Sequence, residues 1–339
     1  MSRHFCHLLI VSLLLAGCQP NSDPGSNSTN SDAGASSQKS SDYPRRSVQI
    51  VCPWGVGGGT DRISRYFADA LRRELGKPFV VVNKTGGSGV LGHSSGANAK
   101  PDGYTITTIT AELNTMHQMG LTKLTYKNYI PLLQMNADAA AIIVRQDATW
   151  KTLTDFLEHV RNKPGQVKMS GTAAGGTWDL ARVGMLQAAG LSKESTKWVP
   201  TQGAASSLTE LLGGHLDAVC CSVPEAAQQI ADGQLRVLAV MSEKRLSKFP
   251  DIPTVRESGT DWVAVGWRGL ALPNNTPADI VATLSAACQR IVESPRYREY
   301  MDKEGFGITI RHTEDFESFL KDQDAQWGPV VASFIKSKP

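Results

Sequence analysis

The chain has 339 residues with a formal net charge of +3, and 20% of its residues are charged. This mild positive charge does not supply the basic surface that nucleic-acid binding requires, so we expect no nucleic-acid partner. The part after residue 44 is longer than one small hydrophobic core usually organises, and this length favours two lobes.

The six cysteines form no CxxC pair and no cluster with histidine at the spacing of a zinc site, so we expect no metal. Cys52, Cys220, Cys221 and Cys288 lie in segments that are expected to fold, where buried small hydrophobic residues are the default interpretation. A disulfide between distant cysteines stays open at this point, because export would place the chain in an oxidising compartment.

Residues 1–17 have the features of an export signal, with Arg3 and His4 ahead of an apolar run from Leu8 to Ala16. The run is too short to span a bilayer, so we expect cleavage. Leu15-Ala16-Gly17-Cys18 has the form of a lipobox, which predicts a lipoprotein signal peptide and a lipid anchor on Cys18. An ordinary signal peptide followed by a chance cysteine is the alternative. Both interpretations place the protein in the cell envelope, periplasmic or extracytoplasmic.

Residues 18–46 consist mostly of serine, asparagine, aspartate and glycine. A segment of this composition cannot bury enough apolar surface to fold. We therefore predict a disordered tether that holds the folded part away from a membrane.

From residue 47 onward, apolar runs alternate with helix-patterned stretches, which is typical of an α/β protein. In chain order, we expect strands over residues 47–53, 79–82, 104–109, 139–144, 167–170, 218–221 and 237–241. We expect helices over residues 61–75, 153–161, 178–189, 208–212 and 226–231, with another that ends before Pro101. Thr276 is expected to cap a helix that reaches about Glu293, and Ser294 and Thr313 are expected to begin two more.

Three glycine-rich loops each precede a predicted helix, at residues 54–60, 83–89 and 170–177. A loop of this kind aims unpaired backbone N–H groups at an anion, and the positive end of the helix dipole adds to the attraction. Three such loops in one chain favour the capture of several negative groups of one small ligand.

Sequence motifs for catalysis are weak in this chain. Gly55 to Thr60 comes near the dinucleotide fingerprint but ends in threonine, and no phosphate-binding P-loop motif occurs, so no nucleotide or other cofactor is expected. Gly92-His93-Ser94-Ser95-Gly96 satisfies the nucleophile-elbow pattern of esterases, although only two apolar residues precede it where a strand is needed. We expect a protein that is not an enzyme, with an esterase-like hydrolase as a weak alternative.

The segment from Pro53 to Asp61, together with Arg65, resembles the opening of the tripartite tricarboxylate transporter substrate-binding proteins, the Bug or TctC family. The resemblance runs from about residue 47 to the C-terminus. It continues through Asn83 with the glycines up to Gly92, residues 100–105, 213–217, 238–240 and 250–254, and Trp267-Arg268-Gly269-Leu270.

This resemblance implies a periplasmic-binding-protein fold of type II, in which two α/β lobes joined by two crossing strands close over a small carboxylate. Lobe 1 would comprise residues 47–144 and 241–339, and lobe 2 residues 145–240. The crossings would lie near residues 142–145 and 238–241. The implied ligand-binding residues are Trp54, Gly57, Gly58, Gly59, Thr60, Asn83, Ser88, Gly89, Gly171, Thr172, Gly176, Thr177, Cys221 and Ser222.

Three positions depart from the common family pattern. Trp54 either walls the pocket or packs under its loop, and Thr60 stands where an aromatic residue is common in the tricarboxylate-binding branch. Cys221 stands where many relatives have an acid, which disfavours an amino-acid ligand and favours a plain carboxylate. Asp61 is expected to cap its helix, and whether Arg268 points into the cleft stays open.

The family resemblance therefore predicts a receptor that captures a di- or tricarboxylate outside the cytoplasm and delivers it to membrane permease subunits. A monomer is expected. A sensory subunit that contacts a signalling receptor is one alternative, and a receptor for an aromatic or nicotinate-like acid is another.

Overall fold

The computed structural model describes residues 42–336. The predicted signal peptide, the predicted lipid anchor at Cys18 and most of the predicted tether lie outside this range. None of the helices between residues 42 and 336 has the length and apolar character that a membrane span requires.

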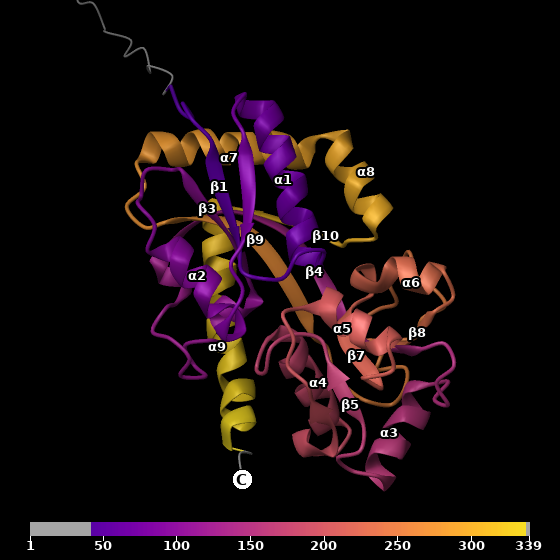
Figure 1. Ribbon diagram of the computed structural model, residues 1–339. Coiled ribbons are helices and arrows are strands. Elements are labelled where there is room, and N and C mark those ends of the chain that lie inside the picture. Colours follow the sequence, from indigo (N-terminus) through magenta and orange to yellow (C-terminus); the bar gives the residue numbers. More distant parts are fainter. Residues whose placement is uncertain (1–41, 337–339) are drawn as a thin grey trace, which may run out of the picture. The chain divides into compact units, whose positions relative to one another are not determined.

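Strands and helices alternate along the described chain, as the sequence predicts (Figure 1). The strands are β1 (Val48–Cys52), β2 (Phe79–Asn83), β3 (Thr105–Thr110), β4 (Tyr129–Arg145), β5 (Lys168–Ser170), β6 (Lys197–Trp198), β7 (Ala218–Ser222), β8 (Leu235–Val240), β9 (Val265–Pro273) and β10 (Ile308–His312). The α-helices are α1 (Gly59–Leu75), α2 (Val90–Ala97), α3 (Leu153–Asn162), α4 (Thr177–Ala188), α5 (Ala204–Leu212), α6 (Ala227–Ala231), α7 (Ala278–Glu293), α8 (Pro295–Glu304) and α9 (Thr313–Lys336). Short 3₁₀ turns include η1 (Gly87–Gly89), η2 (Ala111–Asn114) and η5 (Val223–Ala226).

The strands form two sheets that share the long strand β4. In the first sheet β1 lies between β2 and β3 in parallel, and β9 pairs antiparallel with β3 and with the first part of β4. In the second sheet the last part of β4 pairs antiparallel with β7 and β8, and β5 pairs in parallel with β6 and β7. The change of partner falls between Ala139, which pairs with β9, and Ala140, which pairs with β7.

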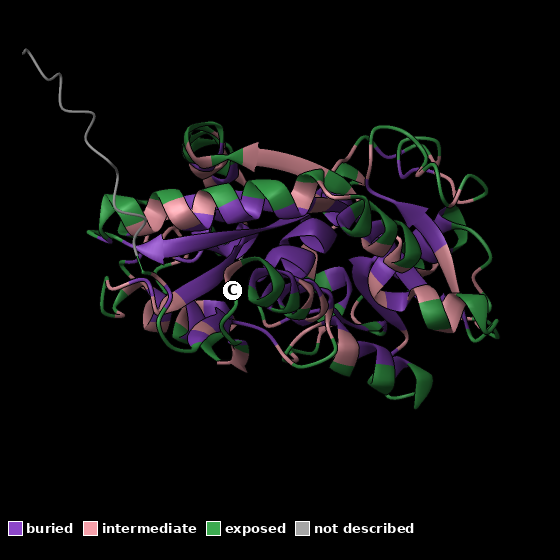
Figure 2. Ribbon diagram, turned by 90° about the horizontal axis from the view of Figure 1, so that it is seen from above, coloured by how far each residue is buried: buried purple, intermediate pink, exposed green. Residues whose placement is uncertain are grey.

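Each sheet has a hydrophobic core of its own, and most strands are buried while the outer helix faces are exposed (Figure 2). Strand β10 is only partly buried. Helices α1, α7 and α8 cover one face of the first sheet, with Phe67, Leu284 and Tyr297 in that core. Phe316 and Leu320 of α9 pack on the opposite face. The core of the second sheet takes its members from residues 140–264. Two cores separated by a shared strand are the arrangement expected of two lobes.

The predicted lobe boundaries stay predictions. The core around the second sheet includes Val255 and Ala264, which lie beyond the predicted boundary at residue 240. The chain re-enters the first sheet at Val265, where β9 begins beside Ala139. At the other end, Tyr43 donates a hydrogen bond from its hydroxyl to the Gly103 carbonyl, so part of the predicted tether lies against the fold.

The structure contains strands β6, β9 and β10, which were not predicted, and it differs from the predicted elements at further places. The strand expected over residues 139–144 is only the end of β4, because buried polar residues such as Gln134 and Asn136 interrupt the apolar pattern of its first part. The cap predicted at Thr276 is wrong: Pro277 is the N-cap of α7, and the Thr276 hydroxyl donates to the Pro273 carbonyl. Helix α1 begins at Gly59, two residues before the expected start.

The last helix packs beside the first sheet and against α4. Phe316 and Leu320 near its start lie in the core beside the first sheet, whereas Trp327 and Val331 pack against Leu180 of α4. Figure 1 shows α9 in yellow running from the first sheet down beside α4.

Candidate functional site

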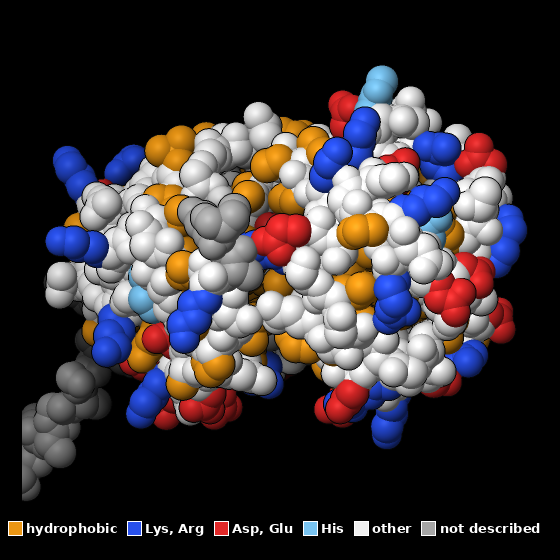
Figure 3. Space-filling view, turned by 90° about the horizontal axis from the view of Figure 1, so that it is seen from below, with side chains coloured by type: hydrophobic (Ala, Val, Ile, Leu, Met, Phe, Trp, Pro, Cys, Tyr) orange, Lys and Arg blue, Asp and Glu red, His pale blue; other side chains and the backbone are white. Residues whose placement is uncertain are grey.

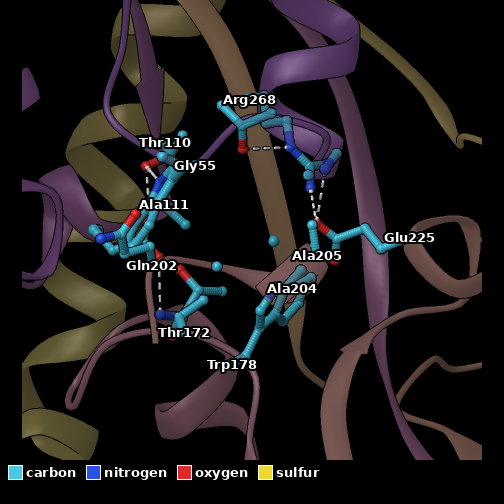
Figure 4. Close-up of a pocket in the computed structure, with 18 of the residues that line it drawn as sticks. Gly55, Thr110, Ala111, Thr172, Trp178, Gln202, Ala204, Ala205, Glu225 and Arg268 are labelled. Carbon is cyan, nitrogen blue, oxygen red and sulfur yellow. Dashed lines mark hydrogen bonds and ion pairs between the residues drawn. The ribbon is translucent and has the colours of Figure 1, made fainter. Parts of the chain in front are cut away.

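A cavity lies between the two lobes (Figure 4). Its volume is about 670 Å³, which includes solvent at its open side. Its lining residues come from both lobes, and they are Trp54, Gly55, Val56, Gly58, Gly59, Thr60, Thr110, Ala111, Glu112, Thr172, Thr177, Trp178, Gln202, Gly203, Ala204, Ala205, Ser206, Glu225, Gly266, Trp267 and Arg268. Six of the predicted binding residues are among them, namely Trp54, Gly58, Gly59, Thr60, Thr172 and Thr177.

The first glycine loop is held in shape by Asp61. Its carboxylate accepts the backbone N–H of Gly57 at 2.9 Å, the Arg65 guanidinium at 2.9 Å and the Asn83 amide at 2.8 Å. Burial by itself would raise the pKa of Asp61, but these donors outweigh it and the pKa lies below its usual value. The N-cap of α1 is Gly58, so Asp61 fastens the loop to the first helical turn and is not the cap itself, contrary to our expectation.

Trp54 fulfils both roles that the sequence leaves open. Its indole N–H donates to the Thr110 hydroxyl at 3.3 Å, and its ring lies against Gly89 from the second loop. The same side chain lines the cavity. Asn83 also stabilises this loop, because its amide donates a second hydrogen bond to the Trp54 carbonyl at 2.9 Å. Asn83 itself does not line the cavity.

The second loop lies beside the cavity and does not line it. Ser88 has a positive φ of 57° and donates from its hydroxyl to the Ala174 carbonyl of the third loop at 2.9 Å. Gly89 leaves room for Trp54 and for His93. The predicted residues Ser88 and Gly89 are therefore placed at a contact between the lobes.

The third loop repeats the geometry of the first. The N–H of Gly175 donates to the Asp179 carboxylate at 2.9 Å, as Gly57 donates to Asp61. Thr172 and Thr177 line the cavity, whereas Gly171 and Gly176 serve close packing. A Cβ atom on Gly171 would lie 1.9 Å from the Cys220 carbonyl oxygen, so no larger residue fits there without movement.

Two carboxylates of the protein occupy helix N-termini across the lobes. Glu112, from η2, accepts the N–H of Thr177 at the start of α4 at 2.9 Å, and it also accepts the Thr110 hydroxyl. Glu225, from η5, accepts the N–H of Gly59 at the start of α1 at 3.2 Å. The favourable position of an anion at a helix N-terminus explains both contacts.

Arg268 lines the cavity from β9 and is already paired. Its guanidinium donates to the Asp138 carboxylate at 2.8 Å, to Glu225 at 3.1 Å and to the Thr60 hydroxyl at 3.0 Å. Burial would lower the pKa of Arg268, but the two carboxylates outweigh it, and the side chain stays charged. Figure 4 shows Arg268 and Glu225 pointing toward one another.

A fourth helix N-terminus was missed by the sequence analysis. Helix α5 begins at Ala204, four residues before the predicted start, and its N-cap Gly203 has a φ of 141°. Residues 203–206 all line the cavity, and within residues 42–336 the N–H groups of Ala204, Ala205 and Ser206 have no hydrogen-bond partner. Small residues at the helix start gave no apolar periodicity, and only the glycine before them signals it.

Cys221 and Ser222 end strand β7 and are not among the residues that line the cavity. Burial raises the pKa of Cys221 well above its usual value, and its side chain is fully buried. Ser222 donates from its backbone and its hydroxyl to Glu225, at 3.1 and 3.0 Å, and so fixes the position of that carboxylate. Cys52, Cys220, Cys221 and Cys288 are all free and buried, which confirms their interpretation as packing residues.

The esterase hypothesis is contradicted by the structure. Gly92 to Gly96 lie inside helix α2, and a nucleophile elbow requires a sharp turn between a strand and a helix. Between residues 42 and 336 no group of three acidic, histidine or cysteine side chains is arranged to hold a metal ion.

A model of the tripartite tricarboxylate transporter family receptor matches residues 63–335 of the chain. The chain belongs to this family. The resemblance inferred from the sequence motifs is thereby confirmed, and the receptor is of a family that binds solutes. A curated relative, the UPF0065 protein in the gbd 5' region of Cupriavidus necator, is 29% identical to it over 83% of this chain and 85% of the relative.

Solved structures agree with this assignment. A TctC solute-binding protein from Polaromonas is 36% identical, with a TM-score of 0.62, over 86% of this receptor and 99% of that chain. The periplasmic binding protein BugD is 29% identical, with a TM-score of 0.78, over 85% and 97%. The predicted fold, that of a two-lobed periplasmic binding protein, is confirmed.

Proposed function

We propose that this receptor captures a small carboxylate in the cavity between its lobes and delivers it to the membrane subunits of a tripartite transporter. The observation that carries the proposal is the cavity itself, which has aromatic walls and is reached by helix N-termini from both lobes. Pockets of small acids combine such apolar walls with a few convergent polar groups.

We propose different roles for the predicted site residues. Gly58, Gly59, Thr60, Thr172, Thr177 and Trp54 line the cavity and would contact the ligand. Gly57, Asn83, Ser88, Gly89, Gly171, Gly176, Cys221 and Ser222 would shape the loops that hold it.

Anchoring through a lipid on Cys18 and a tether up to residue 46 stay part of the proposal. A receptor held near the membrane surface would meet the permease at a high effective concentration. Replacing Cys18 by serine is expected to release the protein from the membrane fraction, and retention of the variant there would count against lipidation.

Thermal unfolding of the full chain with single acids tests capture. A ligand that binds only the folded state at a hundred times its Kd stabilises the protein by about 2.7 kcal/mol. We expect at least one acid among benzoate, hexanoate, succinate, adipate and citrate to raise the midpoint temperature of thermal unfolding. If none of a wide carboxylate panel does so, the proposed function is wrong.

A further inference from the structure

We propose that the ligand carries one carboxylate on an apolar body, and not the two or three carboxylates that the sequence favours. This inference rests on the proposed function and names the class of acid that the cavity accepts. Three independent features of the cavity lead to it, namely its charges, its helix N-termini and its walls.

The charged groups of the cavity are unfavourable for a second carboxylate. Glu112 and Glu225 line it, and Arg268 is its one cationic lining residue within the described chain. That guanidinium is neutralised by Asp138 and Glu225, and the side chains of Arg268, Asp138 and Glu225 are all at most 5% exposed. An additional buried carboxylate would find no unpaired cation, and burying an unpaired charge is strongly unfavourable.

Glu112 and Glu225 each accept one N–H group at the helix N-termini that we first assigned to the ligand. Displacing Glu112 would remove the Thr177 N–H and the Thr110 hydroxyl from a carboxylate that is buried. A buried acceptor that loses its partners costs more free energy than a new hydrogen bond returns. The ligand is therefore not expected to replace either acid.

The start of α5 offers a place for an anion that no carboxylate of the protein occupies. Ala204, Ala205 and Ser206 line the cavity, and their N–H groups have no partner in the described chain. These donors and the dipole of a nine-residue helix suit one carboxylate.

Aromatic and aliphatic side chains form a large part of the remaining wall, beside the hydroxyl groups of Thr60, Thr110, Thr172 and Thr177. Trp54, Trp178 and Trp267 line it together with Val56 and Ala111. The Trp178 ring lies against Gly266, where a Cβ atom would come within 2.7 Å of the ring. The glycine at this position therefore leaves the space that the Trp178 ring occupies. An apolar body gains free energy by contact with such a surface, whereas a polar acid loses hydration there.

Calorimetric titration of the full chain with two matched pairs of acids tests the proposal. Hexanoate and adipate share a six-carbon chain and differ by one carboxylate, as do benzoate and terephthalate. We expect each monocarboxylate that binds to do so at least ten times more tightly than its dicarboxylate. Equal or tighter binding of adipate or terephthalate would overturn the proposal and leave the proposed function intact. Absence of binding by all four, together with failure of the wider panel, would reject both.

A substitution in the first turn of α5 tests where the carboxylate lies. Ser206→Asp places a competing carboxylate beside the free N–H groups, and because Ser206 is exposed and acids stabilise helix starts, the variant should fold. We expect the affinity for the monocarboxylate to fall at least ten-fold. Thr209→Asp adds the same charge to an exposed position on the same helix outside the cavity and should change affinity less than three-fold, as solvent screens it. Equal effects of the two variants would contradict the assigned position.

Discussion

At the scale of single residues, the site depends on buried charges that are satisfied by partners far apart in the sequence. Arg268 joins Asp138 from β4, Glu225 from η5 and Thr60 from α1. The sequence analysis identified Trp267-Arg268 as a family motif, but the partners lie 130 and 43 residues away. No local pattern indicates such pairing, so Glu112 and Glu225 could not be predicted as cavity residues.

Replacing Arg268 by methionine leaves two buried carboxylates without their cation. We expect the free energy of unfolding to fall by about 3–5 kcal/mol at pH 7, as is usual when one partner of a buried ion pair is removed. Urea denaturation of the wild type and the variant measures this loss in the free energy of unfolding. Arg290→Met removes an exposed pair with Glu74 and should cost less than about 1 kcal/mol. Equal losses in both variants would contradict the role of Arg268.

Asp61 predicts a specific dependence of stability on pH. Its pKa in the folded protein lies below the unfolded value of about 3.9, so its contribution is fully present above that value. The contribution is lost as the pH falls through the folded pKa. The stability difference between wild type and Asp61→Asn should therefore shrink below pH 4. A difference that stays constant from pH 6 to pH 3 would show that the charge of Asp61 does not matter.

At the scale of elements, the sequence located most helix starts and strands because apolar periodicity and glycine loops mark them. The predicted strand covers only the end of β4, because buried polar residues interrupt the apolar pattern of its first part. The predicted helix covers only the later part of α5, because the start of α5 consists of small residues. In the loops at residues 54–60 and 170–177, Thr60, Thr172 and Thr177 line the cavity, and their role in binding stays a prediction. The acids that fill the helix N-termini come from other elements, which only the fold brings near.

Packing at the third loop should tolerate no Cβ atom at Gly171. Gly171→Ala would place that atom 1.9 Å from the Cys220 carbonyl, and we expect a loss of about 1–3 kcal/mol in the free energy of unfolding. Gly328→Ala is the matched control, because Gly328 lies within helix α9 and its Cβ atom would have room. Because Pro329 follows and disfavours a helical residue with a Cβ atom before it, the gain from helix propensity is offset, and that variant should change stability by less than about 1 kcal/mol. Thermal or urea unfolding measures the stability of both variants. An unchanged free energy of unfolding in Gly171→Ala would contradict the close contact with the Cys220 carbonyl.

At the scale of the molecule, the two lobes touch through a small set of polar contacts around the cavity. Glu112 to Thr177, Glu225 to Gly59 and Ser88 to Ala174 all cross between the sheets. Figure 3 shows acidic and basic side chains interspersed over the lower face, in keeping with the mild net charge of +3. Such an arrangement gives no large field of one sign on this face.

Closure of the lobes over a ligand should slow amide hydrogen exchange near the crossing contacts. We expect added protection in peptides that contain residues 54–60, 171–178 and 201–207 when a binding acid is present, because opening of the cleft then costs more free energy. Helix α3, which does not line the cavity, should exchange unchanged. Protection confined to α3 or spread evenly over the chain would contradict closure at this cavity.

The most direct test of the central claim is a crystal structure of the protein grown with the carboxylate that binds most tightly. We predict that the acid lies in the cavity between Trp54 and Trp178, with its carboxylate within hydrogen-bond distance of the N–H groups of Ala204, Ala205 and Ser206. An acid bound outside this cavity would contradict the account.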